Sequence, residues 1–196
     1  MKLKKILVPL DESQLAEWAL APATRIATAL SAEIVLLHVV VPLDIDLILP
    51  EASLIHAEEE AETYLAAIRT RLADAGANMT TDVVVGSGAA MAVIKYAQEN
   101  DVDLIVMSSH GRSGLTRWRY GSVTARLLRQ ATCPVLVIPD QTGDGPFAFR
   151  RILVPLDGSE MAAQALQPAA ALAQAVSAEI VLLRASFASR SQLSAT

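Results

Sequence analysis

Short apolar runs and longer amphipathic stretches alternate along residues 1–140. Runs with the length and β-branched content of buried parallel strands lie at 5–9, 34–40, 80–85, 104–107 and 135–138. Between them, the spacing of apolar residues predicts helices at 14–30, 52–75 and 89–100, and another helix that opens at 121–122. Strands that alternate with helices require a parallel sheet with right-handed crossovers. The pattern therefore predicts an α/β fold with a doubly wound, five-stranded parallel sheet.

Single residues predict how two of these helices begin, bend and end. Asp11 or Ser13 is expected to cap the first helix. Pro22 lies inside the same helix, where it should remove one hydrogen bond and bend the helix. Gly76 predicts the end of the second helix.

The beginning of the chain is repeated near its end. Residues 152–157 read ILVPLD, as residues 6–11 do, at an offset of 152 − 6 = 146, and the likeness continues to 183. Residues 141–149 have the composition of a linker. We therefore expect a tandem arrangement with a complete domain at 1–140, a linker at 141–149 and a partial second copy at 150–196. That copy supplies a strand, a helix at 160–176, a strand and a polar tail.

Composition and charge narrow the classes of function. The net charge of −5 argues against a nucleic-acid partner, which usually requires a basic face. The single cysteine, Cys133, excludes an internal disulfide and favours a reducing compartment. No signal-peptide pattern precedes the first strand, and charges interrupt the richest apolar stretch, 34–50, before it could span a membrane. We expect a cytoplasmic protein without membrane contact.

The main chemical signal follows the fourth predicted strand. Residues 108–114 read SSHGRSG, a small-residue loop whose backbone N–H groups can approach a ligand closely. Gly121 and Ser122 then open a helix, whose N-terminus carries unpaired N–H groups and the positive end of the helix dipole. This arrangement predicts a phosphate site; the alternative is a tight structural turn, with Ser122 as the helix N-cap.

Asp11 follows the first strand, as the glycine loop follows the fourth. The carboxyl ends of parallel strands meet at one edge of the sheet, so Asp11 and Gly111 are expected to be neighbours in space. Asp11 is the main acidic candidate for ligand contact, and its alternative role is to cap the first helix.

The spacing of Gly111, nine further residues and Gly121-Ser122 resembles the nucleotide loop of the universal stress protein family. The family's pattern is Gly, two residues, Gly, nine residues, then Gly-Ser or Gly-Thr. Ser108 stands where that pattern has its first glycine. The resemblance covers nearly the whole chain and implies a Rossmann-like fold of the adenine nucleotide alpha hydrolase-like type.

The resemblance also implies a ligand and a set of contacts. The ligand would be ATP or AMP, bound as a regulatory ligand in a stress response, with Mg²⁺ accompanying the phosphates. Asp11 would lie near the adenosine or the ion, and Val39 would pack the adenine. The implied binding residues are Pro9, Leu10, Asp11, Ser13, Val39, Ser108, His110, Gly111, Arg112, Gly114, Gly121, Ser122 and Val123.

Motifs of dedicated enzymes are missing from the sequence. It has no P-loop, no dinucleotide fingerprint, no nucleophile–base–orienter set and no pair of histidines at metal-ligand spacing. We therefore assign no catalytic residue and no protein-held metal. Two alternatives to nucleotide regulation stay open: a dimeric interaction module of the same fold that binds no nucleotide, which Ser108 favours, and a slow ATPase.

The predicted strand at 135–138 lies between Pro134 and Pro139 and is expected to be the last of its sheet. By resemblance, such strands pair across a dimer. A homodimer through this edge strand is therefore expected.

Overall fold

The computed structural model describes residues 3–42, 51–111, 120–139 and 149–184. The chain divides into two compact units, Lys2–Phe147 and Ala148–Thr196 with Met1. Each unit is described by itself.

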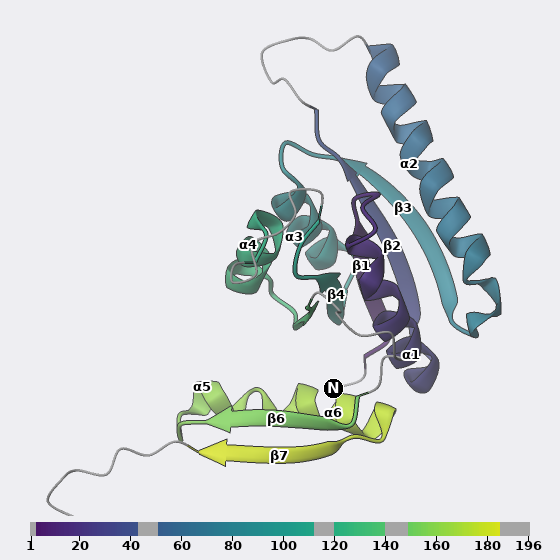
Figure 1. The fold of residues 1–196 in the computed structure, drawn as a ribbon. Helices are drawn as coiled ribbons and strands as arrows, with labels where there is room; N and C mark the ends of the chain where they lie inside the picture. The colour runs from purple at the N-terminus through teal and green to yellow at the C-terminus, as the bar shows by residue number, and fades with distance from the viewer. Residues whose placement is uncertain (1–2, 43–50, 112–119, 140–148, 185–196) are drawn as a thin grey trace, which may run out of the picture. The chain divides into compact units, whose positions relative to one another are not determined.

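The first unit is built on a five-stranded parallel sheet (Figure 1). Its strands are β1 (Lys5–Leu10), β2 (Glu33–Val40), β3 (Asn78–Val85), β4 (Leu104–Ser108) and β5 (Val135–Ile138). They lie in the order β3-β2-β1-β4-β5, so the connection after β3 crosses to the other half of the sheet. The predicted doubly wound α/β fold is confirmed, and the loops after β1 and β4 lie beside the point where the strand order reverses.

Helices cover both faces of this sheet. The elements are the 3₁₀-helix η1 (Ala16–Ala19), α1 (Leu20–Leu30), α2 (Glu51–Arg71), the 3₁₀-helix η2 (Ala73–Ala75), α3 (Ala89–Glu99) and α4 (Ser122–Gln130). Figure 1 shows α2 on one side of the sheet and α3 with α4 on the other. The core under α3 and α4 joins Leu7, Leu37 and Ile105 of the sheet to Val93 and Leu127 of the helices.

The prediction of one bent helix over 14–30 is wrong. The segment forms η1 first, and α1 begins only at Leu20, so Pro22 lies in the first turn of α1. An N–H in that turn has no partner within the helix, and proline therefore costs no hydrogen bond there. Likewise, α2 ends at Arg71, and Gly76 with φ 74° follows η2 instead of ending the long helix directly.

The second unit repeats the same local plan. It contains β6 (Arg151–Leu156), α5 (Glu160–Ala163), α6 (Leu166–Val176) and β7 (Glu179–Arg184), and its two strands are parallel. The helix predicted at 160–176 is thus two helices, and Pro168 lies in the first turn of α6. One strand pair with its helices leaves apolar side chains exposed: Leu153 keeps 56% and Leu183 50% of its surface.

No helix in the described part of the chain is long and apolar enough to cross a bilayer.

The repeat supplies a matched pair of leucines for a stability test. Leu7 is completely buried, whereas Leu153, its counterpart at the offset of 146, is 56% exposed. Leu7→Ala should lower the free energy of unfolding by about 2–5 kcal/mol, and Leu153→Ala by less than about 1 kcal/mol. Chemical denaturation of the full chain measures both values. An equal loss for Leu153→Ala would mean that its apolar face is covered in solution.

Candidate functional site

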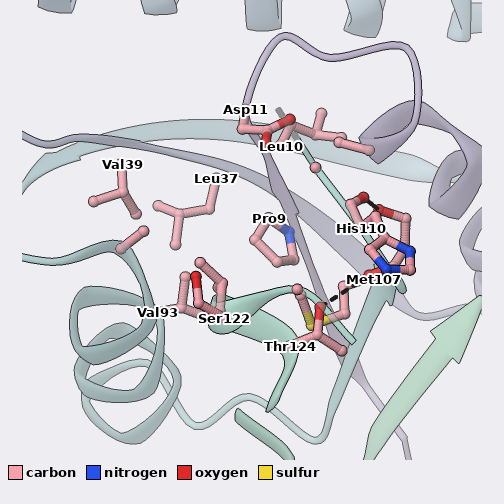
Figure 2. A pocket seen from close by; sticks show the side chains of 16 residues that line it. Pro9, Leu10, Asp11, Leu37, Val39, Val93, Met107, His110, Ser122 and Thr124 are labelled. Atoms are coloured by element: carbon pink, nitrogen blue, oxygen red, sulfur yellow. Dashed lines mark hydrogen bonds between the residues drawn. The ribbon is translucent and has the colours of Figure 1, made fainter. Parts of the chain in front are cut away.

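A cavity of about 250 Å³ lies where the carboxyl ends of β1, β2 and β4 meet the first residues of α3 and α4 (Figure 2). Three strand ends and two helix N-termini thus converge on one space. The lining residues are Pro9, Leu10, Asp11, Ala16, Leu37, Val39, Ala89, Val93, Met107, Ser108, His110, Gly111, Gly121, Ser122, Val123 and Thr124.

The loop after β1 places the carboxylate of Asp11 at the rim of this cavity. Asp11 Oδ1 accepts hydrogen bonds from the backbone N–H of Ser13 at 3.1 Å and from its hydroxyl at 2.6 Å. The hydroxyl of Ser13 also accepts from the N–H of Ala16, the first residue of η1, at 3.1 Å, so Ser13 joins Asp11 to η1.

Gly111 lies directly against Asp11, as expected from the topology. A Cβ added to Gly111 would come within 2.1 Å of Asp11 Oδ2. A side chain at position 111 would force the Asp11 carboxylate, which Ser13 holds, out of its place. The contact joins the two loops that are 100 residues apart in sequence (111 − 11 = 100).

Hydrogen bonds within the glycine loop fix its backbone. The hydroxyl of Ser108 donates to the carbonyl of His110, and that of Thr124 donates to the carbonyl of Ser108 at 3.2 Å. The N–H of Gly121 donates to the carbonyl of Ser109 at 2.9 Å, which joins the start of α4 to the end of β4. Ser108 thus turns its hydroxyl toward its own loop.

One side of the cavity is apolar. In Figure 2, Leu37, Val39 and Val93 gather on one side, and His110 lies on the opposite side with Met107. Gly86 brings α3 close to this wall, because a Cβ there would meet the Cβ of Ala92 at 2.9 Å. The surface suits the flat, weakly polar face of a base or another aromatic ring.

Two helix N-termini also border the cavity. α4 begins at Ser122 after Gly121, and α3 at Ala89 after Gly88; neither has a side-chain cap among the described residues. Each first turn therefore keeps backbone N–H groups that can donate hydrogen bonds to an anion, and each helix dipole places partial positive charge there.

Most of the residues predicted from the sequence surround this one cavity. Ser13 is hydrogen-bonded to Asp11 and does not line the cavity, and Arg112 and Gly114 lie outside the described residues. The alternative of Ser122 as N-cap is wrong, since the N-cap is Gly121. The lining residues that sequence reasoning missed are Ala16, Leu37, Ala89, Val93, Met107 and Thr124. For Leu37 a signal existed: it is two residues before Val39, so both share one face of β2.

Other chemistry is sparse in the described part of the chain. No group of three or more His, Cys, Asp or Glu side chains there could hold a metal ion. Cys133 packs against the core beside β5, and burial raises the pKa of its thiol, as expected for a structural cysteine.

The chain belongs to the universal stress protein family, whose model matches residues 2–139 and 148–195. It is 33% identical to the universal stress protein MJ0577 of Methanocaldococcus jannaschii over 153 residues, which cover 69% of this chain and 94% of that protein. The universal stress protein YxiE of Bacillus subtilis is 29% identical over 148 residues, with 68% and 97% covered.

Solved structures agree with this membership. The MJ0577 structure superimposes with a TM-score of 0.65 over 73% of this chain and all of that chain, at 33% identity. A universal stress protein in complex with cAMP is 25% identical, with a TM-score of 0.51 over 71% of this chain and 98% of its own. A universal stress protein from Archaeoglobus fulgidus shares the fold over 98% of this chain and 71% of its own, with 20% identity and a TM-score of 0.77.

The contact between Gly111 and Asp11 predicts different costs at the two loop glycines. A Cβ on Gly121 would make only ordinary contacts, at 3.5 Å from the Ser109 carbonyl oxygen and 3.7 Å from His110 Cα. Gly111→Ala should therefore lower the free energy of unfolding by about 1–3 kcal/mol, and Gly121→Ala by no more than about 0.5 kcal/mol. Denaturant titration measures this difference. Gly111→Ala should cost much less in an Asp11→Ala background; an unchanged cost would show that the clash is not with Asp11.

Proposed function

We propose that this protein binds ATP or AMP in the cytoplasm as a regulatory ligand in a stress response. The observation that carries the proposal is one cavity whose lining combines an apolar wall with a glycine loop and two uncapped helix N-termini. A nucleotide has the same division between a flat base and charged phosphates. The relative in complex with cAMP supports an adenine nucleotide in this fold.

In this proposal the base and the phosphates contact different parts of the cavity lining. The base packs on Leu37 and Val39, and the phosphates accept hydrogen bonds from N–H groups at Gly111, Ser122 and Val123. Ser108 is compatible with this placement, because its hydroxyl is bonded to the carbonyl of His110 and the cavity is open beside it.

The charge of Asp11 bears on the form of the ligand. A carboxylate beside phosphates would repel them, and a divalent cation between the two would convert that repulsion into attraction. Mg²⁺ is commonly held by one or two carboxylates together with substrate phosphates and water. Asp11 with the phosphates would be such a ligand set, so Mg²⁺ would accompany ATP.

The first experiment asks whether nucleotide binds. Freshly purified protein is denatured and searched for released nucleotide, and then ATP, AMP and cAMP are titrated calorimetrically with and without Mg²⁺. We expect co-purified ATP or a dissociation constant in about the micromolar range. No binding up to millimolar nucleotide would favour the interaction module, and phosphate release at a steady rate would favour the slow ATPase.

Gly121→Ala is the matched variant for this titration. Its added Cβ fits the protein, but it lies beside the first-turn amides that we assign to the phosphates. We expect the variant to melt as the parent does and to bind ATP about tenfold more weakly, because close backbone approach is lost. Unchanged affinity would place the phosphates elsewhere.

We propose further that two copies associate through β5. The carbonyls of Pro134 and Ile138 accept from the N–H groups of Ile105 in β4 and of Ser109, which follows β4. Alternate residues of a parallel strand turn both backbone groups to the same side, so those of Val135 and Val137 point away from β4. Among the described strands, β5 is the last of this sheet, and an edge strand is a template for pairing.

Val137→Pro tests this association. It removes an outward N–H and leaves the ladder to β4 intact, so we expect a monomer in light scattering at concentrations where the parent is a dimer. Val137→Ala keeps the N–H and should remain a dimer. If the parent has a monomer mass at every concentration, or if Val137→Pro stays dimeric, this edge is not the interface.

A further inference from the structure

A series of hydrogen bonds leads from the cavity into η1. The carboxylate of Asp11 accepts from Ser13, and the hydroxyl of Ser13 accepts from the N–H of Ala16, the first residue of η1. The side chain at the rim of the cavity is therefore tied to the position of η1.

The next residue of η1 is held by two side chains of α2. The carboxylate of Glu17 accepts from the hydroxyl of Tyr64 at 3.2 Å and from the guanidinium of Arg71 at 2.5 Å. Burial and the neighbouring carboxylate of Glu17 raise the pKa of Tyr64, so its hydroxyl keeps the proton that it donates. The Tyr64 ring also lies edge-on to the buried ring of His38, with centroids 6.3 Å apart. Glu17, Tyr64 and Arg71 form a clamp between η1 and α2.

The loop at the other end of this series is strained. Glu12, between Asp11 and Ser13, has φ 65°, a left-handed conformation that costs free energy for any residue other than glycine. Such a conformation persists where the surrounding structure imposes it.

The second unit provides the same loop without the clamp. The N–H of Ser159 donates to Asp157 Oδ1 at 2.8 Å and its hydroxyl caps Ala162, as Ser13 does for Asp11 and Ala16. At the offset of 146, Glu12 corresponds to Gly158, with φ 93°, and Glu17 corresponds to Ala163. Where the clamp carboxylate is missing, a glycine relieves the strain.

We propose that Glu17 is a positioning residue for the nucleotide site: its clamp to Tyr64 and Arg71 holds the strained loop at 11–13, which keeps the Asp11 carboxylate against Gly111. The inference rests on the proposed function, because it assigns the fixed carboxylate a part in nucleotide affinity. Without the clamp, Glu12 relaxes toward negative φ and Asp11 leaves its place. With a glycine at position 12, the loop keeps its shape without the clamp.

The test uses Glu17→Ala in two backgrounds, the parent chain and Glu12→Gly. The first readout is the exchange rate of the Ser13 amide hydrogen, measured by NMR without nucleotide. We expect Glu17→Ala to speed this exchange about fivefold to tenfold in the parent and by less than about twofold in Glu12→Gly. The reason for the difference is that glycine adopts the left-handed conformation without a free-energy cost. The Ser159 amide, which makes the same bond in the second unit, is the internal control and should not change.

The second readout is affinity for ATP with Mg²⁺. Glu17→Ala should weaken ATP binding by about fivefold to tenfold, and Glu12→Gly should restore it in the double variant. Tyr64→Phe, which removes one clamp donor and little volume, should give a smaller loss in the same direction. Glu99→Gln, which removes an exposed ion pair with Lys95, is the control and should leave affinity unchanged.

The two readouts separate failure of the clamp from failure of the proposed function. Unchanged Ser13 exchange in Glu17→Ala overturns the clamp, whatever ATP does. Faster exchange with unchanged ATP affinity overturns the positioning role, and an equal loss of affinity in both backgrounds does the same. If the parent binds no nucleotide, the proposed function fails and the positioning role fails with it, while the exchange rates still decide whether the clamp holds the loop.

Discussion

The arrangement of the site depends on the close contact between Asp11 and Gly111. It exists because β1 and β4 are neighbouring parallel strands whose carboxyl ends lie at one edge of the sheet. The strand order reverses here, so the segment after β1 continues into η1 and α1, whereas the segment after β4 leads to α4. The carboxylate and the glycine loop therefore face the same cavity, and the absence of a Cβ at Gly111 lets them meet.

Around this contact, the apolar and polar parts of the cavity lining have separate physical origins. The apolar part is the continuation of the core, because Leu37 of β2 and Val93 of α3 belong to the cluster that holds α3 and α4 on the sheet. The polar part arises from the way α3 and α4 begin, with glycines in place of capping side chains. The proposed nucleotide would thus complete the caps of two helices while it covers an extension of the core.

The sequence predicted the parts of this structure that local pattern determines. Apolar runs placed all five strands, and parallel topology brought Asp11 to Gly111. Pro22 was misjudged because the start of α1 is set by the η1 turn before it, which hydrophobic spacing does not reveal. The Glu17 clamp was not predictable, since its bonds join residues 47 and 54 positions apart and only the packing of α2 brings them together.

The most direct test of the central claim is the change in backbone amide chemical shifts when ATP and Mg²⁺ are added to the ¹⁵N-labelled full chain. We predict the largest changes at Asp11, Gly111, Gly121 and Ser122, with smaller ones at Val39 on the apolar wall. The amides of β6 and β7, which repeat β1 and β2 without the glycine loop, should stay in place. Absence of changes at millimolar ATP, or changes concentrated away from the cavity, would contradict the claim.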